Sequence, residues 1–143
     1  MTPHIAPLPR LVSLLGSSLA LYVADAGIWT YPGAEEIKLA LADLADDHRS
    51  LIDRAGAVLE DRGADVPRHP YPIQFTATHD LDLRALLPRI VAGLESQAAA
   101  LENTAAAGGD AEETGLVGEA LTSTRAHLND LRQLLARPRD ASS

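Results

Sequence analysis

The chain has no cysteine, a single lysine and few aromatic residues, and these shortages exclude several classes of site. Without cysteine it forms no disulfide, no thiolate metal site and no cysteine nucleophile, and its redox compartment stays undecided. Aromatic residues make up 3% of a chain that is 46% hydrophobic. The core must therefore consist of Leu, Ala, Ile and Val, which favours packed helices over a β-sandwich. A length of 143 residues fits one domain with its own core.

Basic residues are also few, and the formal net charge is −8. An acidic surface repels the phosphates of DNA and RNA, so we expect no nucleic-acid partner. No run of basic residues suggests a patch that binds a membrane surface, so we expect no membrane partner either. We therefore expect a cytoplasmic protein.

An apolar stretch near the N-terminus, residues 11–23, has two interpretations. Arg10 precedes it and Ala24-Asp25-Ala26 follows it, as in a secretory signal with its cleavage site, which would make residues 1–26 a signal peptide. The run is too short to span a bilayer as a helix. Its apolar residues recur at the spacing of a core helix: Leu8, Leu11, Leu15, Leu19, Tyr22 and Ala26. We favour the core helix, and the signal peptide stays open.

Glycine and proline divide the chain into four predicted helices. These cover residues of about 9–29, 34–62, 80–107 and 111–137. In the second helix a seam advances in alternating steps of four and three, which is typical of lengthwise packing: Ile37, Leu41, Leu44, His48, Leu51, Ala55 and Val58. Pro88 should kink the third helix or mark its true start. Asp110 and Glu113 predict a capping box at the start of the fourth.

The lengths of the connections predict the topology. The connections before residues 34 and 111 are short, which indicates two antiparallel hairpins. Residues 63–79 contain three prolines and no helical period, and we expect Tyr71 and Phe75 to pin this segment to the helices. About 17 extended residues reach roughly 55 Å, more than the length of a helix of about 28 residues, roughly 42 Å. We therefore predict an all-α fold over residues 1–143, a single four-helix bundle whose hairpins are joined by a long crossover.

Two histidines occupy corresponding positions on apolar seams of the second and fourth helices, His48 and His127. Together with the long crossover, this pair resembles the ferritin-like proteins. That family places a Glu-x-x-His motif on each of these two helices and a glutamate on each of the other two, which together bind two iron ions. The resemblance extends over nearly the whole chain, and it also implies a homodimer that forms along the first hairpin.

The chain departs from the family at most of the carboxylate positions. Ala45 and Thr124 stand three residues before the two histidines, where the family has glutamate. The first helix offers Ser17 and Ser18 near its middle, and Glu95 on the third helix is the one candidate for a family glutamate. A di-iron centre needs several hard oxygen ligands, so we expect neither ferroxidase nor oxygenase chemistry.

Three functional hypotheses remain. The first is a non-catalytic structural protein, or one that binds an unknown protein partner, without a cofactor. The second is a protein that holds one divalent metal ion with His48, His127 and Glu95. Against it stands the interpretation of both histidines as core residues with hydrogen-bond partners. The third is a histidine phosphotransfer module, which needs an exposed histidine. We interpret Asp43, Asp46, Asp47 and Ser50 as a solvated face of the second helix.

Overall fold

The computed structural model describes residues 6–27, 31, 33–67, 71–78 and 81–137, and all regular elements in these ranges are helices. The α-helices are α1 (Pro7–Gly16), α2 (Leu19–Asp25), α3 (Glu35–Asp61), α4 (Leu83–Ala106) and α5 (Ala111–Ala136), and η2 (Ile73–Thr78) is a 3-10 helix. The prediction of an all-α fold is therefore confirmed for the described residues.

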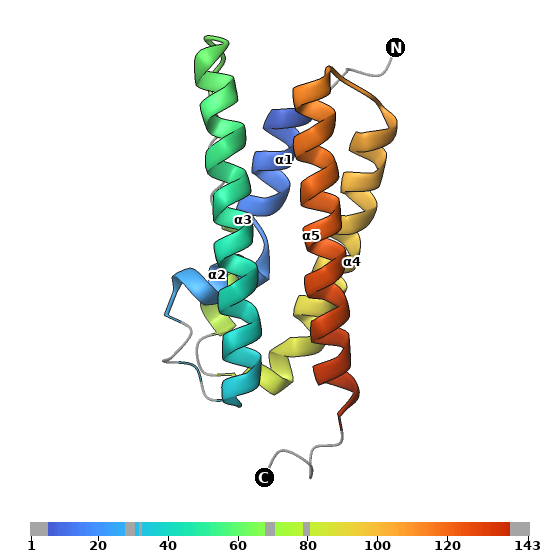
Figure 1. The fold of residues 1–143 in the computed structure, drawn as a ribbon. Helices are drawn as coiled ribbons and strands as arrows, with labels where there is room; N and C mark the ends of the chain where they lie inside the picture. The colour runs from blue at the N-terminus through green and yellow to red at the C-terminus, as the bar shows by residue number, and fades with distance from the viewer. Residues whose placement is uncertain (1–5, 28–30, 32, 68–70, 79–80, 138–143) are drawn as a thin grey trace.

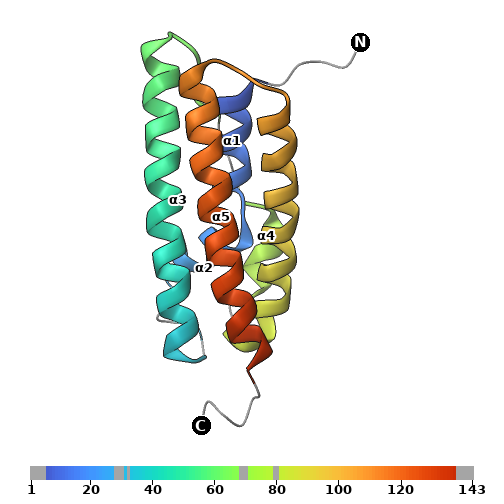
Figure 2. The ribbon, with the colours of Figure 1, turned by 45° about the vertical axis from the view of Figure 1, so that its right-hand side comes forward.

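The three long helices lie side by side along the molecule. Figures 1 and 2 show α3, α4 and α5 next to one another, with α1 and α2 following one another along the remaining side. Helices α3 and α4 point in the same direction, whereas α5 points back. Contacts join α5 to both α3 and α4, and α1 touches all three long helices.

The prediction of one continuous helix over residues 9–29 is wrong. The chain forms α1 and α2 instead, and the two are bent by 58° relative to each other. Ser17 donates a hydrogen bond from its Oγ to the Ser13 carbonyl at 2.6 Å, and Ser18 Oγ accepts one from the Leu21 amide at 3.1 Å. Serine side chains compete in this way for backbone groups, which stabilises a helix end or start at these positions. The predicted helix end at Trp29 lies outside the described residues.

The N-terminal apolar stretch packs inward from both short helices. Leu11 and Leu15 of α1 and Ala20 and Val23 of α2 are all buried. No single described helix is long and apolar enough to cross a membrane, whereas α1 and α2 pass that test of length and composition as a bent pair.

Side chains cap the N-termini of α4 and α5. Asp82 caps α4, because its carboxylate accepts a hydrogen bond from the Arg84 amide at 2.7 Å. Pro88 lies inside α4 and so does not mark its start. At α5, Asp110 and Glu113 form the predicted capping box, with reciprocal bonds of 2.8 and 2.9 Å.

The segment between α3 and α4 is fastened by aromatic side chains. The rings of Tyr71 and Tyr22 of α2 meet edge to face, with centroids 5.1 Å apart. The centroid of the Phe75 ring lies 5.6 Å from that of the Tyr22 ring. The Tyr71 hydroxyl also donates to Asp25. These contacts match the pinning role that the sequence suggests. The segment was expected to lack helix, but it contains η2, which buries Thr78 against the Tyr31 hydroxyl at 3.2 Å.

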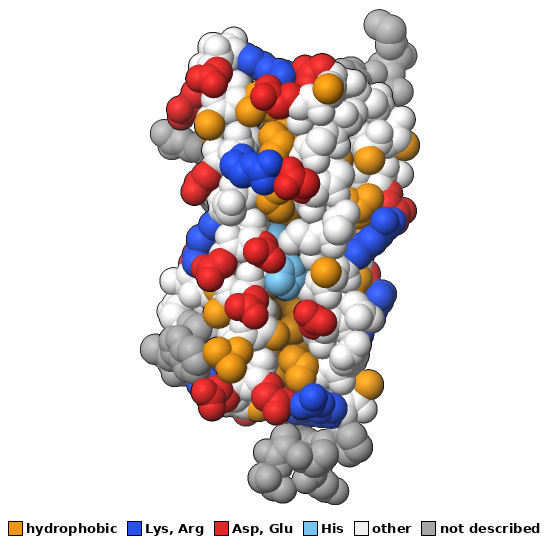
Figure 3. Space-filling model, in the orientation of Figure 1, with side chains coloured by type: hydrophobic (Ala, Val, Ile, Leu, Met, Phe, Trp, Pro, Cys, Tyr) orange, Lys and Arg blue, Asp and Glu red, His pale blue; other side chains and the backbone are white. Residues whose placement is uncertain are grey.

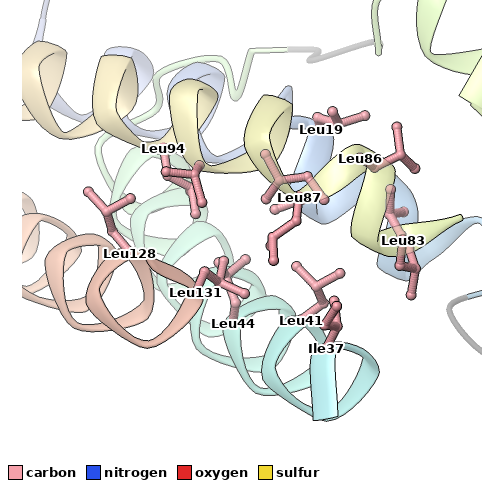
Figure 4. Close-up of a cluster of buried hydrophobic side chains, with 14 of the residues drawn as sticks. Leu19, Ile37, Leu41, Leu44, Leu83, Leu86, Leu87, Leu94, Leu128 and Leu131 are labelled. Atoms are coloured by element: carbon pink, nitrogen blue, oxygen red, sulfur yellow. The ribbon is translucent and has the colours of Figure 1, made fainter. Parts of the chain in front are cut away.

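The core consists of two apolar clusters, one toward each end of the molecule. Figure 4 shows the first, built by α2, the beginnings of α3 and α4 and the end of α5, with Leu41, Leu44, Leu87, Leu94 and Leu131 among its members. The second joins α1 to the end of α3, the end of α4 and the beginning of α5, and it includes Leu11, Leu51, Leu101 and Val117.

Candidate functional site

A polar layer separates the two apolar clusters. Residues of α3, α4, α5 and the break between α1 and α2 contribute to it. On α3 the first cluster ends at Leu44 and the second begins at Leu51, and His48 lies between them. Gln97 takes the corresponding place on α4, and Thr124 on α5. The break between α1 and α2, with Ser17 and Ser18, falls between Leu15 of the second cluster and Leu19 of the first. The middle of the fold is therefore where polar chemistry is concentrated.

His48 is a fully buried member of this layer. Its exposed fraction is 0%, and neither Nδ1 nor Nε2 has a hydrogen-bond partner among the described residues. Burial, together with the proximity of His127, lowers the pKa of His48 to about 4, although Asp47 opposes the shift. The imidazole is therefore neutral at pH 7. Both of its nitrogens are buried without a hydrogen-bond partner among the described residues.

His127 lies beside His48 and reaches the surface. The two rings meet edge to face, with centroids 6.0 Å apart and an angle of 88° between their planes. The His127 side chain is 13% exposed, and its Nε2 lies 2.5 Å from Asp47 Oδ2. Asp47 was expected on a solvated face, and it is indeed 59% exposed, yet it reaches across from α3 to α5 and holds this imidazole. Sequence analysis missed it as a site residue.

The structure does not bring Glu95 to the histidine pair. Its carboxylate is 50% exposed and accepts a hydrogen bond from Arg132 of α5 at 2.9 Å. The physical reason is helical geometry: the preceding residue, Leu94, points into the core, and one residue further along is about 100° around the axis. Within the described ranges, no group of three or more His, Asp or Glu residues is arranged to hold a metal ion.

The residues three positions before the two histidines are Ala45 and Thr124, and both belong to the buried interior. The Thr124 Oγ1 accepts a hydrogen bond from Gln97 Nε2 at 3.1 Å. Because a buried hydroxyl must be hydrogen-bonded, Gln97 and Thr124 satisfy each other across α4 and α5. Gln97 is the second residue of the layer that sequence analysis overlooked, although a glutamine three residues after Leu94 on the α4 seam is a visible signal.

A shallow groove of about 740 Å³ lies between α3 and α5, and His127 lines it. Its walls include Ser50, Gly118, Thr122 and Ser123, whose small side chains leave space between the helices. The Ser123 Oγ is buried there without a hydrogen-bond partner in the described part of the chain. Figure 3 shows this face, with a pale-blue histidine surface at mid-height and carboxylates on either side.

Cross-helix polar pairs line the same seam from end to end. The pairs are Glu36–Arg137, Asp47–His127, Arg54–Glu119 and Arg62–Glu112. The acidic member belongs to α3 in the first two pairs and to α5 in the last two. Along this seam each helix has its named acidic residues in its first half and its named arginines toward its end, so the pairs favour the antiparallel orientation of α3 and α5.

The arrangement offers two kinds of chemistry. A neutral imidazole whose nitrogens have no partner is a metal ligand or a hydrogen-bonding group for a bound molecule. A fully buried His48 lacks the exposure that a phosphotransfer histidine needs. Comparisons with protein-family models, curated proteins and solved structures found no match for this chain.

Proposed function

We propose that this chain is a ferritin-like four-helix bundle without di-iron chemistry, which acts as a structural or partner-binding protein. The observation that carries this proposal is the composition of the polar layer. Where the family has carboxylates, Ala45 completes the core and Thr124 is hydrogen-bonded to Gln97. These neutral side chains give two iron ions few oxygen ligands.

The course of the chain supports the ferritin-like assignment. Helices α3 and α4 run in the same direction, so the segment between them has to return along the molecule, as in a bundle with one crossover. Tyr71 and Phe75 fasten that segment to Tyr22 of α2. In this proposal α1 and α2 together take the place of one long helix.

Two surfaces are available for partners. The groove between α3 and α5 is hollowed above His127 and has charged side chains of both signs along it. The family resemblance adds a homodimer that forms along the hairpin of α1, α2 and α3.

A second candidate function is the binding of one divalent metal ion by His48 and His127. The observation that favours it is the pair of buried, unpartnered nitrogens on His48, next to a second imidazole. Asp47 contacts His127, and it would join the two histidines as a ligand only after the side chains rearrange, because the three are not arranged to hold an ion among the described residues. Two imidazoles and a carboxylate form a ligand set that suits Zn²⁺.

One experiment separates the two candidates. Elemental mass spectrometry of the purified protein gives the metal content per chain, and thermal melts with and without EDTA show whether a metal stabilises the fold. The non-catalytic bundle predicts no bound metal and an unchanged melting temperature.

The metal-binding candidate predicts near-stoichiometric metal that is lost in His48→Ala and His127→Ala. Glu95→Ala is the matched control, because Glu95 lies on the exposed side of α4 and should leave the metal content unchanged. Stoichiometric metal that disappears in both histidine variants would overturn the first proposal.

A further inference from the structure

A second cavity lies on the other side of the polar layer, between the α1–α2 break and α4. Its volume is about 480 Å³, within the usual range of small-molecule sites, and it is more enclosed than the groove between α3 and α5. Leu19, Ile90, Leu94 and Phe75 supply much of its apolar lining. Ser17 and Ser18, at the break between α1 and α2, also line it.

The cavity contains one charged side chain and no carboxylate among the described residues that line it. Arg89 of α4 lines the cavity, and it makes no ion pair or hydrogen bond with any described residue. Most other described arginines contact an acidic side chain, as Arg54, Arg125 and Arg132 do. Arg89 is exposed, so its guanidinium is accessible to an anionic ligand at the rim of the cavity.

Gly93 also lines this space, and it is exposed. It lies inside α4, where glycine is less favourable than alanine by about 0.5–1 kcal/mol. A Cβ atom added at Gly93 would meet nothing within 4 Å, so close packing does not require the glycine. Gly93 lines the cavity one helical turn after Arg89, and any larger side chain there would occupy it.

We propose that this cavity binds a small organic acid with an apolar body, such as a medium-chain carboxylic acid. The apolar walls receive the chain, and the Arg89 guanidinium pairs with the carboxylate at the rim. Arginine suits this role because its planar fork can donate two parallel hydrogen bonds to one carboxylate. The site is separate from the histidine pair and does not depend on the function proposed above.

The test uses decanoate and isothermal titration calorimetry on the full chain, below the concentration at which the acid self-associates. Saturable binding to the parent protein is expected. Arg89→Gln should weaken it by about tenfold or more, the usual effect of losing one hydrogen bond between charged groups. Gly93→Leu should abolish binding by filling the cavity.

Two matched variants control for charge and for a leucine in a helix. Arg10→Gln removes another arginine whose side chain has no partner among the described residues and does not line the cavity. Gly118→Leu adds the same bulk in the groove beside His127. Both should bind decanoate like the parent, and circular dichroism checks that all variants fold. Absence of binding, equal binding of 1-decanol, or binding that survives Gly93→Leu would each overturn the proposal.

Discussion

His48 and His127 face each other edge to face at 6.0 Å, but only His127 has a hydrogen-bond partner among the described residues. Asp47 contacts the outer ring, whereas the inner ring is fully buried without a partner. Unpartnered buried nitrogens are rare in native proteins because each costs the desolvation energy of a polar group. This asymmetry makes the inner histidine the most informative position for mutation.

Replacing His48 by leucine should stabilise the protein. The change removes a buried polar ring without a partner and keeps a side chain of similar size, so we expect the free energy of unfolding to rise by about 1–3 kcal/mol. Urea denaturation at pH 7.5 measures the difference. A clear loss of stability in His48→Leu would mean that a bound ion or molecule satisfies the ring nitrogens.

The stability of the protein should fall as the pH drops from 7 to 5. The folded pKa of His48 is about 4 and its unfolded value is 6.5, so the unfolded chain binds more protons between these values. Protonation therefore favours unfolding, and about 2 kcal/mol should be lost between pH 7.5 and pH 5. His127 and Asp47 are the titratable groups facing this ring, and both contribute to its shift.

The same pH series on His48→Leu isolates the contribution of this residue. The variant should show a flatter dependence above pH 5, where most carboxylates stay ionised. An equally steep dependence in both proteins would assign the effect to other groups.

Much of the fold could be predicted because the apolar periodicity of the long helices is regular. The α4 seam is buried throughout, from Leu83 to Leu101. On α3 the predicted seam holds until its end, where Leu59 is buried in place of Val58. A strict alternation of four and three gives 3.5 residues per turn, and a straight helix with 3.6 drifts away from it.

The sequence-based predictions were wrong where the spacing of residues along one helix does not determine the local backbone or the contacts with other helices. The apolar spacing continues across Ser17 and Ser18, so periodicity alone does not reveal the break between α1 and α2. Glu95 and Asp47 both lie next to a buried residue on their helices, and which of them reaches a histidine depends on the position of α5. The position of α5 follows from the packing of three helices together, and the sequence of one helix does not determine it.

The pair of Arg54 and Glu119 should contribute to the register of α3 and α5 through charge. Its guanidinium and carboxylate form two hydrogen bonds of 2.7 and 3.1 Å, and each side chain shifts the pKa of the other in favour of the charged form. Glu119→Arg should lower the melting temperature at low salt, because it places two cations together. The double variant Arg54→Glu with Glu119→Arg should recover most of the loss.

Salt provides the control for that exchange. Both side chains are exposed, so the difference between the single and double variants should shrink at about 1 M salt, where the screening length is near 3 Å. Failure of the double variant to recover stability at low salt would show that the contact acts through packing rather than charge.

Gly33 and Gly93 should respond to alanine in opposite ways. Gly33 has a φ of +146°, and an added Cβ would lie 2.8 Å from the Cβ of Leu83, which is fully buried at the start of α4. Alanine there combines backbone strain with a clash that the core cannot relieve, so Gly33→Ala should cost more than about 1 kcal/mol.

Gly93→Ala should instead raise the free energy of unfolding by about 0.5–1 kcal/mol, because alanine restricts the unfolded chain and meets no neighbour within 4 Å in the folded one. Urea denaturation of both variants under one condition makes the comparison. A neutral Gly33→Ala would contradict the close approach of the segment before α3 to α4. A destabilising Gly93→Ala would show that the cavity beside Arg89 is narrower than this geometry indicates, which would also count against its occupation by a carboxylic acid.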